Sequence, residues 1–209
     1  MIYLKQLKIN LFFAVCGKMD GFIDKYSLMG KFLVAMPALG DDDLFSRSVV
    51  YVCSHTNRGA MGLIINKPLE QYTFSDLTFQ LPLKNYEKLN EVGLYTGGPV
   101  ERVRGMVLHT TDYIKDGTVE IADGIAVSST NEIIADIAFD KGPDDKLVAL
   151  GYSFWQPNQL ENEIYNNDWL VIDADKELLF RTKDALKWQR AMDESGIRLD
   201  SFIGITAHS

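Results

Sequence analysis

The sequence predicts an α/β protein with α+β character, built on a mixed, largely antiparallel sheet that helices flank. Three observations predict this fold class. Short apolar segments rich in β-branched residues recur along the chain, and turn residues bound them. Amphipathic helical patterns separate only some of these segments, so the strands come in clusters. Because parallel neighbours need a crossover connection between them, this clustering favours antiparallel pairing.

Expected strands are short apolar runs bounded by turn residues. Proline follows two of them, at Pro37 and Pro68, because proline lacks the amide donor of a ladder bond. In chain order the expected strands cover residues 31–36, 48–54, 60–65, 92–95, 103–110, 147–152, 169–172 and 177–180. We expect the last two strands to pair as a hairpin around residues 173–176.

Four helices are expected, and the last of them covers roughly residues 183–194 and stops at Gly196. The first three begin where a capping residue precedes an acidic residue by three positions: Thr73 with Asp76, Ser129 with Glu132, and Asn158 with Glu161. In chain order the four apolar faces carry Phe74, Leu77 and Leu81; Ile133, Ile134, Ile137 and Ala138; Leu160 and Ile164; and Leu186, Trp188 and Met192.

The composition is that of an acidic protein with an ample core. The chain has 209 residues, of which 46% are hydrophobic. Twenty-one basic and 29 acidic residues give a formal charge of −8, which repels a phosphate backbone and argues against direct nucleic-acid binding. The two cysteines, Cys16 and Cys53, match no metal or redox spacing, which fits idle thiols in a reducing cytoplasm.

The first eighteen residues differ from the rest of the chain. Lys5 and Lys8 precede an apolar run, residues 9–16, that is about half as long as a membrane crossing requires. The run also lacks the small-residue cleavage pattern of a secretory signal. We interpret residues 1–28 as a disordered leader or an upstream-start extension, and residues 29–209 as one domain. We therefore expect a cytoplasmic protein with no membrane partner.

The most distinctive stretch is the glycine corner, Gly97-Gly98-Pro99, which lies between two expected strands. Paired glycines before a proline indicate a tight bend without side chains, which a ligand can approach closely. The corner lacks the Lys-Ser/Thr of a P-loop and the third glycine of a dinucleotide fingerprint. It therefore supports at most a small anion site.

Polar residues near this corner are the candidate ligand-binding groups. In an extended strand Arg102 and Arg104 lie on one side, where they either bind one anion or pair with Glu101 and other acids. His109 fits a general acid or base, but a histidine satisfied by a backbone partner is the more ordinary interpretation. The candidate ligand-binding residues are Asn66, Gly97, Gly98, Arg102 and His109.

Other groups that resemble reactive or metal sites have simpler explanations. Cys53 and His55 share one face of an extended strand, but two ligands do not make a zinc site. The carboxylates at residues 41–43 fit a turn or a helix start better than a calcium loop. Residues 151–155 lack the second glycine of a nucleophile elbow. We assign no catalytic, cofactor-binding or metal-binding residue.

Several separate blocks resemble, in order, the YqgE/AlgH family. They include Gly97-Gly98-Pro99-Val100, and together they cover almost everything after residue 29. The full set of matching blocks is residues 30–37, 45–52, 59–68, 97–100, 107–109, 159–164 and 169–170. The resemblance implies a bacterial cytoplasmic protein with an α/β fold of its own. The family is named partly for a proposed role as a regulator of alginate production, and its molecular activity is not established.

One block departs from the family. Relatives usually read Gly-Tyr-Ala/Ser-Gly-Trp-Gly-x-Gly-Gln-Leu, and this chain has Phe154, Gln156 and Asn158 at the last three glycine positions. If those glycines leave room for a ligand, Phe154 and Gln156 fill that room. If they form turns, Pro157 and Asn158 are adequate substitutes, and we favour this interpretation.

Two functional hypotheses remain from these observations. We favour a non-enzymatic regulatory or adaptor protein that acts through protein or small-effector contacts and needs no cofactor. The alternative is an enzyme or binding protein for a small anionic metabolite, which uses the glycine corner with Arg102 and His109. A third hypothesis, direct promoter binding, is disfavoured by the net charge.

Overall fold

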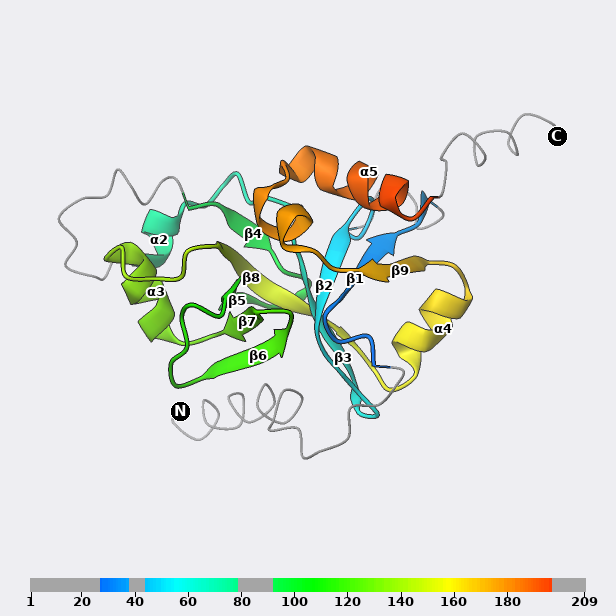
Figure 1. Ribbon diagram of the computed structural model, residues 1–209, viewed down its shortest axis with the longest axis horizontal. Helices are drawn as coiled ribbons and strands as arrows, with labels where there is room; N and C mark the ends of the chain where they lie inside the picture. The colour runs from blue at the N-terminus through cyan, green and yellow to red at the C-terminus, as the bar shows by residue number, and fades with distance from the viewer. Residues whose placement is uncertain (1–26, 38–43, 79–91, 197–209) are drawn as a thin grey trace.

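A curled sheet runs through the described part of the chain, which in this computed structural model covers residues 27–37, 44–78 and 92–196 (Figure 1). Within these ranges the sheet has nine strands. Eight of them follow the order β6-β7-β5-β8-β3-β2-β1-β9, and the ninth, β4, pairs with β8 beside this path. The β4–β8 pair is parallel, and all other strand pairs are antiparallel. The predicted mixed, largely antiparallel sheet with flanking helices is confirmed.

The strands lie close to the segments that the sequence predicts, with two additions. In chain order they are β1 (Lys31–Ala35), β2 (Val49–Thr56), β3 (Gly59–Ile64), β4 (Leu94–Thr96), β5 (Val100–Thr110), β6 (Thr118–Ala122), β7 (Ile125–Ser128), β8 (Lys146–Trp155) and β9 (Trp169–Asp173). The helical elements are α2 (Phe74–Thr78), α3 (Asn131–Ala138), α4 (Gln159–Tyr165), a π-helical turn η3 (Glu177–Arg181) and α5 (Asp184–Glu194).

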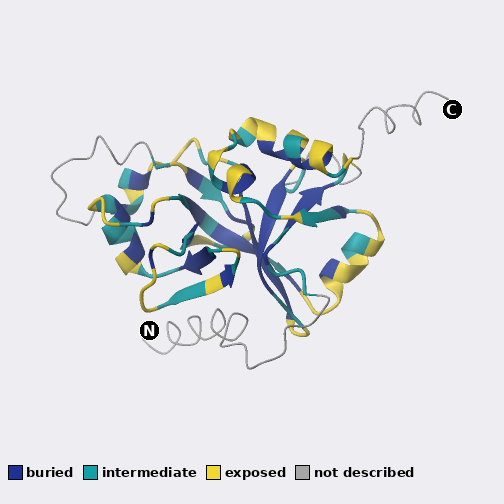
Figure 2. Ribbon diagram, in the orientation of Figure 1, coloured by how far each residue is buried: buried dark blue, intermediate teal, exposed yellow. Residues whose placement is uncertain are grey.

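Helices cover the sheet in three places, and its central strands are buried (Figure 2). Helix α5 packs on β1 and β2, where Trp188, Ala191 and Met192 join the largest hydrophobic cluster. Helix α4 adds Leu160 to a second cluster that contains Trp155. Helices α2 and α3 contact one another and close a third cluster near β4 and β8. Their amphipathic sequences thus supply the cover that the buried strands require.

The sheet curls until strands far apart in the sheet order come together. A Cβ placed on Gly30, just before β1, would lie 2.7 Å from the Cβ of Ala122 at the end of β6. Gly30 also has a left-handed φ of 78°, a conformation that L side chains rarely adopt. Only glycine allows the backbone to approach β6 so closely at this point.

The expected hairpin of residues 169–172 with 177–180 is wrong. Strand β9 pairs with β1 instead, and residues 177–181 form the turn η3, in which the Thr182 amide donates to the Glu177 carbonyl at 2.8 Å. Leu178 and Leu179 are both buried, so an apolar run that reads as a strand is also compatible with a helical turn packed on the core.

The hairpin of β6 and β7 is an element that the sequence analysis missed. Its turn is Asp123-Gly124, and both residues have left-handed φ values, 52° and 71°. An Asp-Gly pair with this geometry is typical of two-residue hairpin turns. The dipeptide between two short β-branched runs was therefore the signal that predicts this hairpin.

Of three expected helix caps, one is displaced, one lies at the predicted residue without its side-chain bond, and one shows the predicted contact. Helix α3 is capped by Thr130 rather than Ser129, and Thr130 Oγ1 accepts from the Ile133 amide at 3.4 Å. Asn158 precedes α4 in a left-handed conformation and makes no side-chain cap. Before α2, Asp76 Oδ2 accepts from the Thr73 amide at 2.7 Å, as the capping pattern requires.

Some predictions fall on residues outside the described ranges. These are the leader interpretation for residues 1–26, the carboxylates at 41–43, and Leu81 in the first expected helix. Ser27 and Leu28 are described, and the Leu28 amide donates to His55 Nδ1 at 3.0 Å. In the described part of the chain, no helix is both long and apolar enough to cross a membrane.

Candidate functional site

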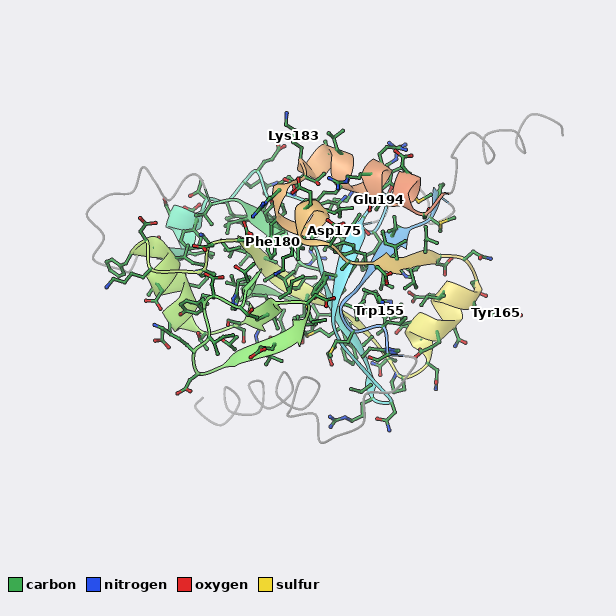
Figure 3. All side chains as sticks on the ribbon, viewed as in Figure 1. Trp155, Tyr165, Asp175, Phe180, Lys183 and Glu194 are labelled. Atoms are coloured by element: carbon green, nitrogen blue, oxygen red, sulfur yellow. The ribbon has the colours of Figure 1, made fainter. Side chains whose placement is uncertain are left out.

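A polar pocket of about 270 Å³ lies where the start of α5 meets the end of β3 and the turn before β2. We call it the α5 pocket. Lys183 and Glu194, at the two ends of α5, locate this helix in Figure 3. The residues that line the pocket are Arg47, Asn66, Lys67, Asp184, Ala185, Trp188 and Gln189.

Asn66 shapes the pocket by holding Arg47 in an unusual backbone conformation. Arg47 has a left-handed φ of 50°, which is uncommon for a residue with a side chain. The Asn66 amide donates from Nδ2 to the Arg47 carbonyl at 2.8 Å, and its Oδ1 accepts from the Val49 amide at 2.8 Å. One buried side chain thus bonds the backbone on both sides of Ser48. These two bonds offset the strain of Arg47 and direct its side chain from a fixed base.

The Arg47 guanidinium lies over an aromatic ring of α5. Its Cζ is 5.6 Å from the centroid of the Trp188 ring, within the range of a cation–π contact. Trp188 is itself fixed, because its Nε1 donates to the Ala35 carbonyl at 2.8 Å. The ring therefore gives the guanidinium a rigid platform. The contact with the face of the ring does not use the guanidinium N–H groups as hydrogen-bond donors.

Asp184, which lines the pocket, pairs with a buried lysine, Lys187. Lys187 is only 2% exposed, yet its Nζ donates to the Ile65 carbonyl at 2.8 Å and lies 3.0 Å from Asp184 Oδ1. Asp184 Oδ2 accepts from the Tyr95 hydroxyl at 3.1 Å. Burial lowers the pKa of Lys187, and the Asp184 carboxylate counteracts part of that effect. Each carboxylate oxygen of Asp184 therefore has a bonding partner within the protein.

Lys67 brings a second cation to the pocket beside Arg47. Burial lowers the pKa of Lys67 below its usual range, and the positive charge of Arg47 lowers it further. Among the described residues, no carboxylate forms an ion pair with Lys67 or Arg47. Two cations that repel one another next to an open hollow make a place where an anion is stabilised.

The glycine corner is filled by its own backbone contacts. A Cβ on Gly97 would lie 2.2 Å from the Gly151 carbonyl oxygen, and one on Gly98 would lie 2.3 Å from the Tyr152 carbonyl carbon. The Gly97 amide donates to the Leu150 carbonyl at 2.9 Å. These glycines therefore let the chain between β4 and β5 pack directly against β8.

His109 is enclosed and fully bonded. It has no exposed surface, and its Nδ1 lies 2.9 Å from the Thr110 carbonyl oxygen, which can only accept. Nδ1 therefore carries the proton, and Nε2 accepts from Ser128 Oγ at 2.9 Å. Burial lowers the pKa of His109 below its ordinary value, so the ring is neutral near pH 7. This is the satisfied histidine that the sequence analysis weighed against an acid–base role.

The two arginines of β5 separate in the structure. Arg104 pairs with Glu101 at 3.2 Å, as one of the two interpretations expects. Arg102 is exposed, and it lies in an irregular stretch of β5 between the positions of Val100 and Gly105 that pair with β8. Of the five candidate ligand-binding residues, only Asn66 lines the α5 pocket, and Gly97, Gly98, Arg102 and His109 do not.

The remaining candidate groups serve internal contacts. Cys53 is buried in the largest cluster, whereas His55 Nε2 donates to Glu161 Oε1 at 2.8 Å and so bonds β2 to α4. The expected cap residue Glu161 is thus a partner of His55. Among the described residues, no group of three or more His, Cys, Asp or Glu side chains is placed to hold a metal ion.

The block that departs from the family pattern spans the end of β8, a turn and the start of α4. Asn158 has a left-handed φ of 63°, which asparagine adopts more readily than most residues and which glycine adopts freely. The Gln156 amide donates to Gln159 Oε1 at 2.9 Å within the same turn. Phe154 packs against the largest cluster. Gln156 and Asn158 therefore agree with the interpretation that the replaced glycines serve turns, whereas Phe154 lies within β8.

The pocket residues Arg47, Lys67, Asp184 and Trp188 were not among the candidates from sequence, nor was Lys187, the partner of Asp184. Arg47 and Lys67 lie in two of the blocks that carry the family resemblance. The signal available was Lys67, a basic residue that follows a buried strand by a few positions and directly precedes a proline. Nothing in the linear pattern shows that Arg47 lies close enough to alter the pKa of Lys67, because that closeness depends on strand pairing.

Comparison with other proteins places this chain in a known family. A family model described as AlgH-like matches residues 32–200. A UPF0301 protein of Rhodopseudomonas palustris is 42% identical over 178 residues, which is 81% of each chain. One of Rhodospirillum rubrum is 42% identical over 170 residues and covers 81% of this chain and 88% of its own.

Two solved structures share the fold. The solution structure of the AlgH protein from Pseudomonas aeruginosa aligns with a TM-score of 0.72 and 31% identity, over 90% of this chain and 99% of that one. A crystal structure from Corynebacterium diphtheriae aligns with a TM-score of 0.63 and 19% identity, over 84% and 91%, and shows the fold alone. The chain belongs to the AlgH-like family, also written YqgE/AlgH, whose members include uncharacterised UPF0301 proteins.

Proposed function

We propose that this protein is a non-enzymatic, cytoplasmic regulatory protein whose α5 pocket binds a small anionic effector. One observation supports this most strongly: Arg47 and Lys67 bring two positive charges to one hollow without a described carboxylate partner. The cost of holding two like charges together is relieved when an anion binds between them.

The size and donors of the pocket define the class of effector. About 270 Å³ is near the lower limit for ligand pockets, so a phosphate or a small acid fits better than a large cofactor. The guanidinium of Arg47 offers paired N–H donors that match the oxygens of a phosphate or carboxylate. Asp184 is already bonded to Lys187 and Tyr95, so its charge is largely compensated.

The described lining of the pocket favours binding over turnover. It offers two cations, an amide, a second amide at Gln189 and a bonded carboxylate, and it includes no imidazole, thiol or hydroxyl side chain. Chemistry on an anionic metabolite generally needs a positioned acid, base or nucleophile that is regenerated in each cycle. We therefore propose that effector binding at this site regulates contacts with protein partners. DNA is disfavoured as a partner, because the acidic protein repels its phosphate backbone.

Anion binding to the purified full chain tests this proposal. Inorganic phosphate and pyrophosphate are titrated at constant ionic strength, with chloride as the reference salt, while the melting temperature is recorded. We expect a saturable rise in Tm, because a ligand of the folded state stabilises it by mass action. The double variant Arg47→Gly/Lys67→Gln should abolish the rise, and glycine suits the left-handed backbone at position 47.

A matched control removes two positive charges elsewhere. Arg58 and Lys141 are exposed and lie outside the pocket lining, so Arg58→Gly/Lys141→Gln should keep the phosphate response. An equal loss of response in both double variants would show only a general charge effect and would contradict the proposal. Turnover of a phosphate ester that Lys67→Gln abolishes, or salt-sensitive retardation of duplex DNA, would contradict its non-enzymatic and protein-directed parts.

A further inference from the structure

Lys67 occupies a position in the α5 pocket that differs from that of every other lysine described above. Its backbone is fixed, because its carbonyl accepts from the Thr96 amide at 2.9 Å and Pro68 forms a bridge with Tyr95. Its side chain is half-buried and lines the open hollow. The amine therefore extends from a rigid base into a space that a small molecule can enter.

The surroundings of Lys67 shift its protonation equilibrium toward the neutral amine. Burial and the charge of Arg47 both lower the pKa of Lys67, so more of it is unprotonated near pH 7 than for an exposed lysine. Lys187 is a useful contrast, because its Nζ is occupied by the Ile65 carbonyl and by Asp184 and is almost fully enclosed. Only Lys67 of these two is both accessible and without a described anionic partner.

We propose that Lys67 is a site of covalent acylation by small acyl phosphates, with Arg47 binding the phosphate group of the donor. This inference rests on the proposed anion pocket and names its reactive group. The Lys67 Nζ lone pair attacks the acyl carbon, a C–N bond forms, and the bond from that carbon to the phosphate oxygen breaks. Inorganic phosphate leaves with the electron pair of that bond and takes up the proton that the amine loses.

The product changes the pocket in two ways at once. An amide at Lys67 has no positive charge, so the electrostatic basis of anion binding falls to Arg47 alone. The acyl group also occupies part of a hollow of about 270 Å³. Acylation therefore removes the effector response, and it is a covalent form of regulation at the same site.

The acylation rate of each lysine tests the inference. The purified full chain is incubated with acetyl phosphate at pH 7.5, and the acetylation of each lysine is followed by peptide mass spectrometry. We expect Lys67 to react about tenfold faster than the exposed Lys141 and Lys183, the factor that one charge-assisted contact to phosphate provides. Added pyrophosphate should slow the reaction at Lys67 alone.

A donor without phosphate and two Arg47 variants separate phosphate recognition from simple nucleophilicity. With the N-hydroxysuccinimide ester of acetate the preference for Lys67 should shrink, and Arg47→Gly should reduce its rate with acetyl phosphate. Arg47→Lys, which keeps the charge but loses the planar fork, should be intermediate and guards against a folding defect. Acetylation of Lys67 no faster than of Lys141, or a rate unaffected by both variants, would overturn the inference.

The outcomes also distinguish this inference from the proposed function. If pyrophosphate raises Tm through Arg47 and Lys67 but Lys67 is not acetylated preferentially, the pocket binds anions and only the covalent step is wrong. If Lys67 reacts preferentially but no anion protects it or raises Tm, the effector site and the recognition by Arg47 are both wrong.

Discussion

The α5 pocket and the protein interior around β4 and β5 both contain polar groups, but these groups differ in whether the fold supplies bonding partners for them. The Gly97 amide is bonded to the Leu150 carbonyl at the corner, and farther along β5 both nitrogens of His109 are bonded to neighbours in the fold. In the pocket, Arg47 and Lys67 repel one another and have no described carboxylate partner. The difference shows that residues which look reactive in a linear sequence can be structural, whereas a ligand site is marked by charge that the fold leaves uncompensated.

Substitution of Gly98 by Ala should have the largest effect and would test the structural side of this comparison. The new Cβ would lie 2.3–2.4 Å from backbone atoms of Tyr152 and Ser153, at a φ of 153° that side chains avoid. Since these atoms cannot move without disturbing β8, we expect a loss of about 4 kcal/mol or more in unfolding free energy. Denaturant unfolding followed by circular dichroism measures it.

Gly105→Ala is the control for this substitution. Its Cβ would lie 4.0 Å from the nearest atom, the Ile134 Cδ1, so the change in unfolding free energy should be below about 1 kcal/mol. If Gly98→Ala were as harmless as Gly105→Ala, the corner would have room to spare, and a ligand role for it would regain support.

Substitution of His109 by Gln should have an intermediate effect and should change the pH dependence of stability. Removing the ring leaves the bonds to Thr110 and Ser128 imperfect, at a cost of about 1–3 kcal/mol near pH 7. Because the pKa of His109 is lowered in the folded state, the unfolded chain binds a proton first as pH falls below about 6.5. The wild type therefore loses stability there through this group.

Unfolding free energies measured from pH 8 to pH 5 check the role of His109. The wild type should lose more stability over this range than His109→Gln, which has no group to titrate at that position. Equal pH slopes for the two proteins would show that His109 is accessible to protons in the folded state, and the interior would then resemble the pocket more than we describe.

Substitution of Arg102 by Ala should have the smallest effect. Arg102 is exposed and lies outside the α5 pocket, so both unfolding free energy and the phosphate response should remain unchanged within about 0.5 kcal/mol. Calorimetric titration with pyrophosphate measures the second quantity. A loss of anion affinity in Arg102→Ala would place the site at the glycine corner instead of α5.

The sequence predicts those parts of the fold that depend on local pattern. Buried apolar runs identify β1, β2 and β3, and the Thr73–Asp76 pair marks the start of α2. Residues 177–181 show where local pattern is insufficient, because an apolar run packed on the core satisfies a strand and a helical turn equally well. Tertiary contacts decide between them.

The candidate site was less predictable for a physical reason. Asn66 was identified, but its partners Arg47 and Val49 lie in another strand region, and the sheet register brings them together. Lys187 occupies the buried face of α5 next to Trp188, whereas the expected core residue Leu186 is 56% exposed. A lysine inside a helix face violates the apolar pattern, and the bond to the Ile65 carbonyl that permits it is visible only in three dimensions.

One carboxylate, that of Glu163, joins distant parts of the sheet. Glu163 of α4 accepts at Oε2 from the indole Nε1 of Trp155 at 2.7 Å and from that of Trp169 at 2.8 Å. Trp155 ends the central strand β8, and Trp169 begins the edge strand β9, whose only pairing neighbour in the described residues is β1. The edge strand is thus tied to the centre of the sheet through a helix, so amide hydrogens of β9 should exchange in concert with those of α4 rather than by independent fraying.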